Sequence, residues 1–311
     1  MNLIADIGAT QSRCAVIDGD GRIQAAEVFQ NRHFDSLQKL LRGYLNQCPD
    51  RPDSAALAVA APILEDEVRM PNLEWRFSLG SLTGELDLRE LVVVNDFAAV
   101  AWGLPALTAA DLHKVGGGAA VAGTAMATLG PGSGLGVATV APCGDQWTVV
   151  EGEGGNITFS GVNPEQQAVT DHIRARYGHC SAESLLSGPG LVNIYMALAE
   201  LRGRTVDRPG PAQVSQAAAD GEALACEARD MFFEVLGTVA GNLALTVGAR
   251  GGVFIAGGIV PQLLEPLERS RLRECFEAKG RYRFYLEAIP TYVITEPYPA
   301  FRGLRRLLGY G

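Results

Sequence analysis

One order of strands and turns occurs twice in this chain, at residues 3–29 and again at residues 126–150. In each copy an apolar strand ends at a glycine-containing turn, at Gly8 in the first copy and at 130–134 in the second, and two further strands follow. Asp-Gly steps such as Asp18-Gly19 join apolar segments in hairpins, so the first copy is expected to be an antiparallel meander. A duplicated unit of this kind predicts two similar lobes that face one another, each with a glycine-rich turn.

Hydrophobic spacing predicts the main elements between and after these copies. Apolar residues at the helical repeat predict a helix over about 37–45, with Asp35 as its cap and Gln38 completing a capping box. Two short apolar strands, 56–60 and 91–94, suit central strands buried on both faces. Helices are expected over 191–201 and 223–247, with a surface loop at 202–212. Strands at 253–256 and 292–294 and a helix from about residue 302 are expected to close the chain.

Composition and charge argue against several classes of protein. Apolar residues make up 47% and charged residues 20% of the chain, which is the balance of a soluble globular protein. A net charge of −9 argues against a nucleic-acid partner. No secretory signal opens the chain, and its apolar runs are expected to fall short of a membrane span. Six scattered cysteines without a CxxC pair are expected to be free thiols, which predicts a cytoplasmic protein.

The glycine-rich turns are candidates for phosphate binding. The sequence has no GxxxxGK[ST] loop, so a phosphate site of the Walker type is excluded. Successive backbone N–H groups in a short glycine turn can instead converge on a phosphate, although such a turn after a strand is more often a simple connection. Asp6 follows the first apolar strand, where its carboxylate suits a hydrated Mg²⁺ ion on a nucleotide or, alternatively, a capped turn.

Polar residues elsewhere suit a polyol substrate. Asn95 and Asp96 follow the strand at 91–94, so Asp96 could accept a hydroxyl proton during phosphoryl transfer while Asn95 binds a sugar hydroxyl. The alternative for this pair is a plain strand-end turn. Glu153, Asn156 and Glu183 lie in or near glycine-rich segments that are commonly solvated loops, but they would form a polyol site if they converge.

Taken in order, these segments resemble the bacterial glucokinase family across essentially the whole chain. The matching segments are Asp6 to Thr10, Pro71 to Trp75, Val94 to Phe97, Gly130 to Gly136, Gly152 to Gly155, Ser181 to Asn193, and Gly251 to Pro261. The last two of these segments are long and specific, so chance similarity does not explain the match.

The resemblance implies a fold and an activity. The fold would be α/β and two-lobed, of the actin-like (ribonuclease H-like) class with a central cleft. Residues 1–106 and 296–311 would form a small lobe and residues 107–295 a large one. The activity would be ATP-dependent phosphorylation of the 6-hydroxyl of glucose, with ATP and Mg²⁺ as cofactors and a small-molecule sugar as substrate. A homodimer is expected from the resemblance and from the frequency of two-fold symmetry.

The resemblance also assigns roles to single residues. Asp96 would be the general base toward the sugar hydroxyl. The sugar would be bound by Asn72, Asn95, Asp96, Glu153, Asn156 and Glu183. The nucleotide phosphates and Mg²⁺ would be bound by Asp6 (through water to Mg²⁺), Gly8, Ala9, Thr10, Gln11, Gly132, Ser133 and Gly134, and the adenosine would be bordered by Gly188, Gly257 and Gly258.

Three departures from the family pattern bear on function. Asn156 stands where the family usually has a histidine that contacts the sugar, and its amide is shorter and cannot become charged. Ala9 and Gln11 replace the usual Gly and Asn of the phosphate turn, which places a Cβ and a longer amide near the phosphates. The segment 299–303 also differs from the glycine-rich turn of the family.

Several functions stay open at this point. A glucose kinase is the leading hypothesis, and a kinase for a different sugar is its variant because of Asn156. A sugar-responsive regulatory protein on the kinase fold, with weak or no catalysis, is the alternative from another class. The presence of Asp96 argues against it, because a sensor has no need of a base. An actin-like filament protein would leave the sugar-site residues without an explanation.

Overall fold

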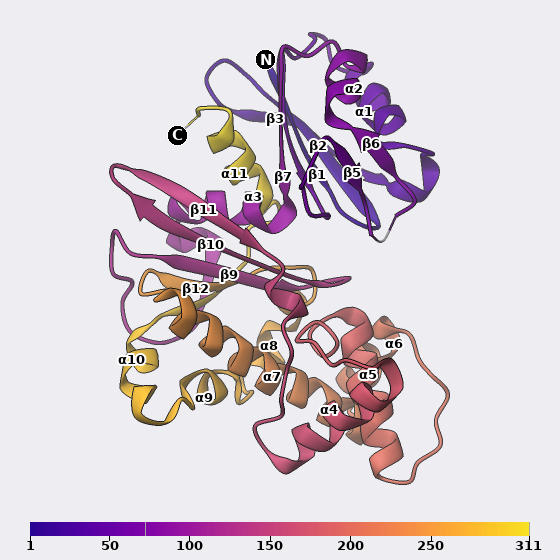
Figure 1. Cartoon of the computed structure of the whole chain (residues 1–311), viewed down its shortest axis with the longest axis vertical. Helices are drawn as coiled ribbons and strands as arrows, with labels where there is room; N and C mark the ends of the chain where they lie inside the picture. The colour runs from indigo at the N-terminus through magenta and orange to yellow at the C-terminus, as the bar shows by residue number, and fades with distance from the viewer. Residues whose placement is uncertain (72, 311) are drawn as a thin grey trace. The chain divides into compact units, whose positions relative to one another are not determined.

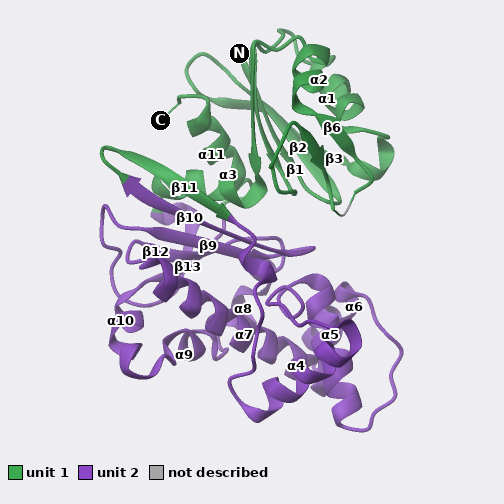
Figure 2. Cartoon of the chain, viewed as in Figure 1, with its two compact units in different colours: residues 1–108, 143–151, 296–311 green, residues 109–142, 152–295 purple. Residues whose placement is uncertain are grey.

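The computed structural model describes residues 1–71 and 73–310, so the predicted sugar ligand Asn72 lies outside the described residues. The chain forms two compact units, and each is built from separate stretches of sequence (Figure 2). Unit 1 comprises residues 1–108, 143–151 and 296–311. Unit 2 comprises residues 109–142 and 152–295.

The sheet of unit 1 begins with the predicted meander. Strands β1 (Asn2–Ile7), β2 (Gln11–Ile17) and β3 (Ile23–Gln30) pair antiparallel, and β4 (Ser54–Val59) and β7 (Glu90–Asn95) continue the sheet parallel to β1. The strand order is β3-β2-β1-β4-β7. As predicted, β4 is buried throughout. The same prediction is wrong for β7, because β7 is the edge strand and its apolar residues stay partly exposed.

Two pairs of helices cover this sheet. On one face α1 (Leu37–Leu45) contributes to a core with Leu3, Leu57 and their neighbours, and α2 (Leu79–Glu85) lies near it beside the short hairpin of β5 (Glu67–Arg69) and β6 (Arg76–Ser78) (Figure 1). On the other face α3 (Asp96–Gly103) and α11 (Pro299–Leu307) pack on each other and on β4. The cap predicted for the first helix is corrected: Ser36 accepts from the Lys39 amide, and Asp35 instead pairs with the Lys39 ammonium group.

The sheet of unit 2 repeats the arrangement of the first. Strand β10 (Leu135–Cys143) is antiparallel to β9 (Met126–Pro131), and β12 (Gly252–Ile255) and β13 (Thr291–Ile294) follow parallel to β9. An additional strand, β8 (Leu112–Gly116), pairs antiparallel with β13. The third strand of the second copy, β11 (Gln146–Gly152), follows β10 across a turn. Strands β10-β9-β12-β13 repeat the order and the directions of β2-β1-β4-β7, so the duplication predicted from the sequence is confirmed for these strands.

The helices of unit 2 contribute to a hydrophobic core that is larger than the core of unit 1. They are α4 (Pro164–Tyr177), α5 (Gly188–Leu201), α6 (Pro211–Ala219), α7 (Ala223–Val247), α8 (Leu264–Glu268), α9 (Leu272–Glu277) and α10 (Arg283–Ala288). The predicted helices at 191–201 and 223–247 are confirmed as α5 and α7, whereas the predicted loop at 202–212 ends earlier because α6 begins at Pro211.

By length and composition, α7 is able to cross a membrane, so the expectation that every apolar run falls short of a membrane span is wrong for this helix. In the structure 61% of its most apolar stretch is buried, and the helix packs against α5, α6 and α9. Gly237 and Gly241 do not interrupt α7: a Cβ at Gly237 would lie 2.1 Å from the Leu272 carbonyl oxygen, so these glycines allow α9 to approach closely. The surroundings of α7 are those of a core helix.

Candidate active site

In unit 1, the predicted phosphate and base residues lie at the same edge of the sheet. Strands β1, β4 and β7 are parallel, and their register pairs Asp6 with Ala58 and Val59 with Asn95. Only β4 separates β1 from β7, so their backbones are about 10 Å apart at this edge. The carboxyl ends of parallel strands are where α/β folds usually bind ligands.

Asn95 and Asp96 mark the junction between β7 and α3. The Asn95 Oδ1 atom caps the helix by accepting hydrogen bonds from the amides of Phe97 (2.9 Å) and Ala98 (3.3 Å). The Asn95 Nδ2 group donates to the Ala61 carbonyl at 3.3 Å, which leaves a second N–H for a ligand hydroxyl. Asp96 is the first residue of α3, where the positive end of the helix dipole stabilises a carboxylate.

Asp6 is held by a charged neighbour. Its Oδ2 atom accepts a hydrogen bond from Arg13 Nη1 at 3.0 Å, and its side chain is only 17% exposed. Burial raises the pKa of Asp6, and the Arg13 guanidinium partly offsets that rise. The same guanidinium lies 6.0 Å from the ring centroid of Tyr298, immediately before α11. Sequence reasoning did not identify Arg13, which register alone places opposite Asp6.

The turn 8–11 is fixed by a buried amide that sequence reasoning also missed. Asn31, which is 1% exposed, donates from Nδ2 to the Gly8 carbonyl at 2.8 Å and accepts from the Ser12 hydroxyl at 2.7 Å. Its backbone amide donates to the Thr10 carbonyl at 3.0 Å. The only sequence signal for this role is a polar residue directly after a strand. Asn31 thus holds the turn in one conformation through its hydrogen bonds to the Gly8 and Thr10 carbonyl groups.

The described residues contain no group of three or more His, Cys, Asp or Glu side chains arranged to hold a metal ion. Asp6 is a single carboxylate at the mouth of the sheet. Magnesium commonly binds proteins through one or two carboxylates and completes its shell with water and substrate phosphates. The residues present therefore fit an ion that arrives on a nucleotide.

In unit 2, the backbone brings the predicted sugar ligands Glu153, Asn156 and Glu183 into one region. Glu153 and Asn156 lie in and beside a short 3-10 turn, and the Glu183 amide donates to the Gly155 carbonyl within that turn at 2.8 Å. Glu153 and Asn156 are exposed, and Glu183 is half-buried. Their convergence, which spacing alone did not establish, results from the pairing of residues 157–159 with 180–182.

The glycine-rich turn of unit 2 meets two other glycine segments. The Gly188 amide, at the start of α5, donates to the Gly132 carbonyl at 2.8 Å. Gly257 follows β12 with φ +84°, and a Cβ there would lie 2.4 Å from the Pro131 carbonyl oxygen, so no other residue fits without a backbone shift. Ser133 is exposed at the tip of the turn, and Gly132 has open space where a Cβ would be. The predicted residues Gly132, Ser133, Gly134, Gly188 and Gly257 therefore form one cluster, with Gly258 exposed beside it.

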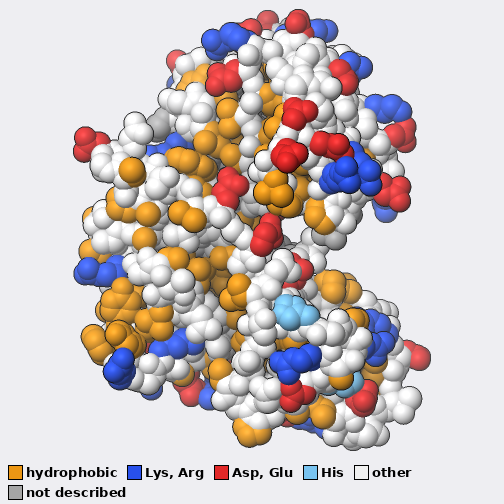
Figure 3. Space-filling view, in the orientation of Figure 1, with side chains coloured by type: hydrophobic (Ala, Val, Ile, Leu, Met, Phe, Trp, Pro, Cys, Tyr) orange, Lys and Arg blue, Asp and Glu red, His pale blue; other side chains and the backbone are white. Residues whose placement is uncertain are grey.

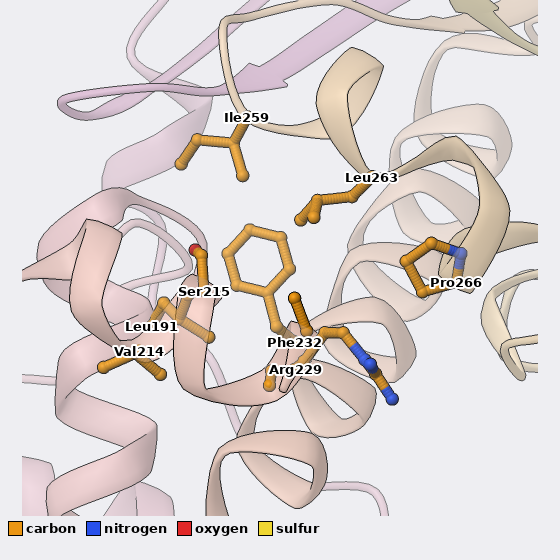
Figure 4. Close-up of a pocket in the computed structure, with 10 residues that line it drawn as sticks. Leu191, Val214, Ser215, Arg229, Phe232, Ile259, Leu263 and Pro266 are labelled. Carbon is orange, nitrogen blue, oxygen red and sulfur yellow. The ribbon is translucent and has the colours of Figure 1, made fainter. Parts of the chain in front are cut away.

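An apolar pocket is lined by residues that are close in sequence to these glycines. Figure 4 shows Ile259 and Leu263 on one side of it, with Leu191 and Val214 on another and the Phe232 ring between them. Ser215 and Arg229 are the polar residues of the lining. Leu191 lies in the first turn of α5 and Ile259 follows Gly258 directly. A flat apolar group bound here would therefore lie near the glycine cluster.

Comparison with known proteins gives one consistent result. A sequence profile of the glucokinase family matches residues 3–309. The chain is 42% identical over 312 residues to a glucokinase of Paramagnetospirillum magneticum, covering 99% of this chain and 97% of the relative. It is also 42% identical over 308 residues to the bifunctional protein glk of Burkholderia pseudomallei; this match covers 98% of the chain but 48% of that relative, so the chain spans about half the length of such bifunctional relatives.

A solved structure shows the same fold. The crystal structure of a glucokinase from an Antarctic psychrotroph superposes with a TM-score of 0.88 at 34% sequence identity, over 100% of this chain and 99% of that one. The actin-like α/β fold class predicted from the sequence is thereby confirmed.

Proposed function

The chain belongs to the glucokinase family, and from this membership we propose that it is an ATP-dependent hexose kinase that phosphorylates the 6-hydroxyl of glucose. The observation that carries the proposal is the edge of the first sheet. Asp6, whose carboxylate suits a nucleotide-borne metal, lies in β1, and Asp96, whose carboxylate suits a sugar hydroxyl, follows β7; the backbones of these two strands are about 10 Å apart. Phosphoryl transfer needs these two functions side by side.

We propose Asp96 as the general base. Its carboxylate would take the proton of the sugar hydroxyl as that oxygen attacks the γ-phosphorus of ATP, and the bond from the γ-phosphorus to the bridging oxygen would break to release ADP. The N-terminus of α3 favours the ionised carboxylate before transfer. The cap made by Asn95 fixes the first turn of this helix, so the base has one backbone position.

The proposed sugar ligands come from the family resemblance. Asn95 has an amide N–H to donate, while Glu153, Asn156 and Glu183 offer carboxylate and amide groups for neighbouring hydroxyls. Asn72 belongs to the same proposed set through the family resemblance. A specific alternative is a kinase for another hexose, since Asn156 replaces the family's histidine and is exposed, where it could contact a substituent of the sugar ring.

The nucleotide would be bound by the two glycine turns and the apolar pocket. The resemblance assigns the phosphates to backbone N–H groups of Gly8, Ala9, Thr10 and Gln11, and of Gly132, Ser133 and Gly134. Gly188, Gly257 and Gly258 would border the adenosine, and the apolar lining of the pocket at Ile259 and Phe232 suits the adenine ring. Mg²⁺, held through water by Asp6, would neutralise charge that develops on the phosphates.

A homodimer and a cytoplasmic location are part of the proposal. All six cysteines are free, which suits a reducing compartment.

Apolar side chains gather over α10 in unit 2 (Figure 3), where Phe284 is 69% and Tyr282 46% exposed. Their rings stack with centroids 6.4 Å apart, and such a patch suits a contact with a second copy. Analytical ultracentrifugation of Phe284→Glu beside the unchanged protein tests this: an unaltered dimer in the variant would place the interface elsewhere.

The deciding experiment is a coupled assay of ADP release over glucose, mannose, fructose and glucosamine. Asp96→Asn, which keeps the shape of the side chain, is the matched control. Turnover of glucose that falls by about 10²–10⁴-fold in the control supports both the activity and the base. Turnover of another sugar alone, restored toward glucose by Asn156→His, supports the alternative specificity. No turnover on any sugar, with no ATP binding by calorimetry, would refute the kinase and leave a regulatory role.

A further inference from the structure

The segment 183–188 is joined to the glycine turn 130–134 at two points. At one end of the segment, the Glu183 Oε2 atom accepts a hydrogen bond from the Leu135 amide at 2.8 Å. At the other end, the Gly188 amide donates to the Gly132 carbonyl at 2.8 Å. The turn closes on itself between these points, because the Gly132 amide donates to the Gly134 carbonyl at 2.8 Å. Both ends of the turn are therefore held by one segment of chain.

The Glu183 carboxylate lies directly over Gly134. A Cβ at that position would be 2.5 Å from the Glu183 Oε2 atom and 3.2 Å from its carboxyl carbon. The absence of a side chain at Gly134 thus leaves the space that the carboxylate fills. The carboxylate and the turn form one fitted contact, which a sugar ligand alone would not require.

The backbone of Glu183 is fixed independently of any ligand. Its amide donates to the Gly155 carbonyl at 2.8 Å, and its carbonyl accepts from the Ser187 hydroxyl at 2.9 Å. Among the described residues, the hydrogen bond of the carboxylate involves Oε2 alone. The Oε1 atom can therefore meet a sugar hydroxyl while Oε2 keeps its bond to the turn.

We propose that Glu183 is a positioning residue for nucleotide binding as well as a sugar ligand, because its carboxylate holds the turn 132–134 in the conformation that accepts the phosphates. This inference rests on the proposed function and deepens it. A hydrogen bond from an amide to a carboxylate is stronger than one between neutral groups, which suits this supporting role. One side chain then links the sugar-binding and phosphate-binding parts of unit 2.

The sign of the expected effect separates this role from simple electrostatics. If Glu183 were only a nearby negative charge, its removal would strengthen the binding of anionic ADP. If it holds the turn, its removal weakens ADP binding, by about tenfold for the loss of one charge-assisted hydrogen bond. Glu183→Gln keeps an oxygen that can accept from the Leu135 amide, so it should bind ADP within about threefold of the unchanged protein.

The test is a calorimetric titration of Mg·ADP in the absence of sugar. The variants are Glu183→Ala, Glu183→Gln and Glu153→Ala, the last as a matched control from the proposed sugar site without a hydrogen bond to the turn. We expect weaker ADP binding only in Glu183→Ala, and weaker glucose binding in all three by tryptophan fluorescence. Circular dichroism melting of each variant verifies that it is folded.

A double-mutant cycle with Gly134→Ala tests the contact itself. In the unchanged background the new Cβ meets the carboxylate, whereas in Glu183→Ala it meets no side chain. Gly134→Ala should therefore weaken ADP binding at least about fivefold more with Glu183 present than without it. Equal effects in the two backgrounds would contradict the proposal.

Other outcomes are equally decisive. ADP affinity in Glu183→Ala within twofold of the unchanged protein, or stronger, overturns the positioning role and leaves the kinase proposal intact. An equal loss in Glu153→Ala also overturns it, because the effect would then not depend on the bond to Leu135. If the unchanged protein fails to bind Mg·ADP, the proposed nucleotide function fails and this inference fails with it.

Discussion

Replacing Gly303 by alanine would push α11 away from α3, the helix that begins at the candidate base Asp96. A Cβ at Gly303 would lie 1.8 Å from the Ala99 carbonyl oxygen and 3.0 Å from the Trp102 Cβ. Real Cβ atoms stay at least 3.0 Å from other heavy atoms, so α11 and α3 would have to move apart by at least about 1.2 Å. The clashing oxygen belongs to the backbone, so rotation of a side chain cannot relieve the contact.

This separation should affect stability and catalysis together. Overpacking of a tight contact costs about 1–3 kcal/mol, and a backbone clash belongs at the upper end. About 3 kcal/mol corresponds to a fall of roughly 5 °C in the melting temperature of a chain of this length, because the unfolding entropy is about 2.1 cal/mol/K per residue. Because Asp96 is the first residue of α3, a shift of about 1 Å in this helix should also lower kcat by roughly 10–100-fold.

Gly84→Ala is the matched control. Gly84 lies in α2 of the same unit, and a Cβ there would meet no atom within 4 Å. This substitution should stabilise the protein by about 0.5–1 kcal/mol, because alanine is the better helix former, and should leave kcat unchanged. Melting curves and initial rates on the three proteins decide the matter. A Gly303→Ala protein that melts and turns over like the Gly84→Ala protein would refute the reasoning.

Three further predictions follow from single residues. Asp87 adopts φ +56° just after α2, where glycine is preferred, so Asp87→Gly should raise the unfolding free energy by about 0.5–1 kcal/mol in urea titrations. Burial raises the pKa of Cys180 to about 11, so iodoacetamide at pH 8 should alkylate the exposed Cys143 first and leave Cys180 unmodified by mass spectrometry. Burial raises the pKa of Asp6, so the ionised carboxylate destabilises the folded protein, and the folded protein becomes more stable as the pH falls. Asp6→Asn should therefore raise the melting temperature more at pH 7.5 than at pH 4.5, and it should abolish Mg·ADP binding.

Local signals account for what the sequence predicted well. The sequence predicts the meander β1-β2-β3 and the helix α7 because turn residues and hydrophobic spacing are patterns among residues that are close in sequence. The parallel pairing of β4 with β1 and with β7 is not local, so the sequence does not predict it. The exposure of β7 also depends on its place at the sheet edge, which an apolar run of residues cannot specify.

The helix α3 shows why a functional element can escape sequence analysis. Its residues after Asp96 are almost all apolar, so no amphipathic period marks it as a helix. It is buried between the sheet and α11, a setting that long-range packing decides. Asp96 was nevertheless identified as a candidate base, because a carboxylate after an apolar strand is informative without knowledge of the helix.

Supporting residues are harder to predict than the residues they support. The place of Asp6 at the end of a strand marks it as a candidate, but Arg13 reaches Asp6 only through the register of β1 and β2. Asn31 acts on the turn 8–11 through hydrogen bonds to the carbonyl groups of Gly8 and Thr10. Each is an ordinary polar residue in its local sequence. Only the fold shows that Arg13 faces Asp6 and that Asn31 lies beneath the turn.

A glycine allows the close contact that positions Asp96 in unit 1 and Glu183 in unit 2. In unit 1 the segment 299–303 departs from the family's glycine-rich turn and contains Gly303, the residue whose missing side chain lets α11 approach the helix of Asp96. In unit 2 the missing side chain of Gly134 lets Glu183 reach the turn. In each case a functional group is placed by contact with the backbone at a position where no side chain intervenes. Substitutions at these two glycines should therefore change function by moving the neighbouring segment. Their effects should depend on the atom that the new Cβ meets. At Gly303 this atom is a backbone oxygen that cannot move aside, whereas at Gly134 it is the end of a flexible side chain.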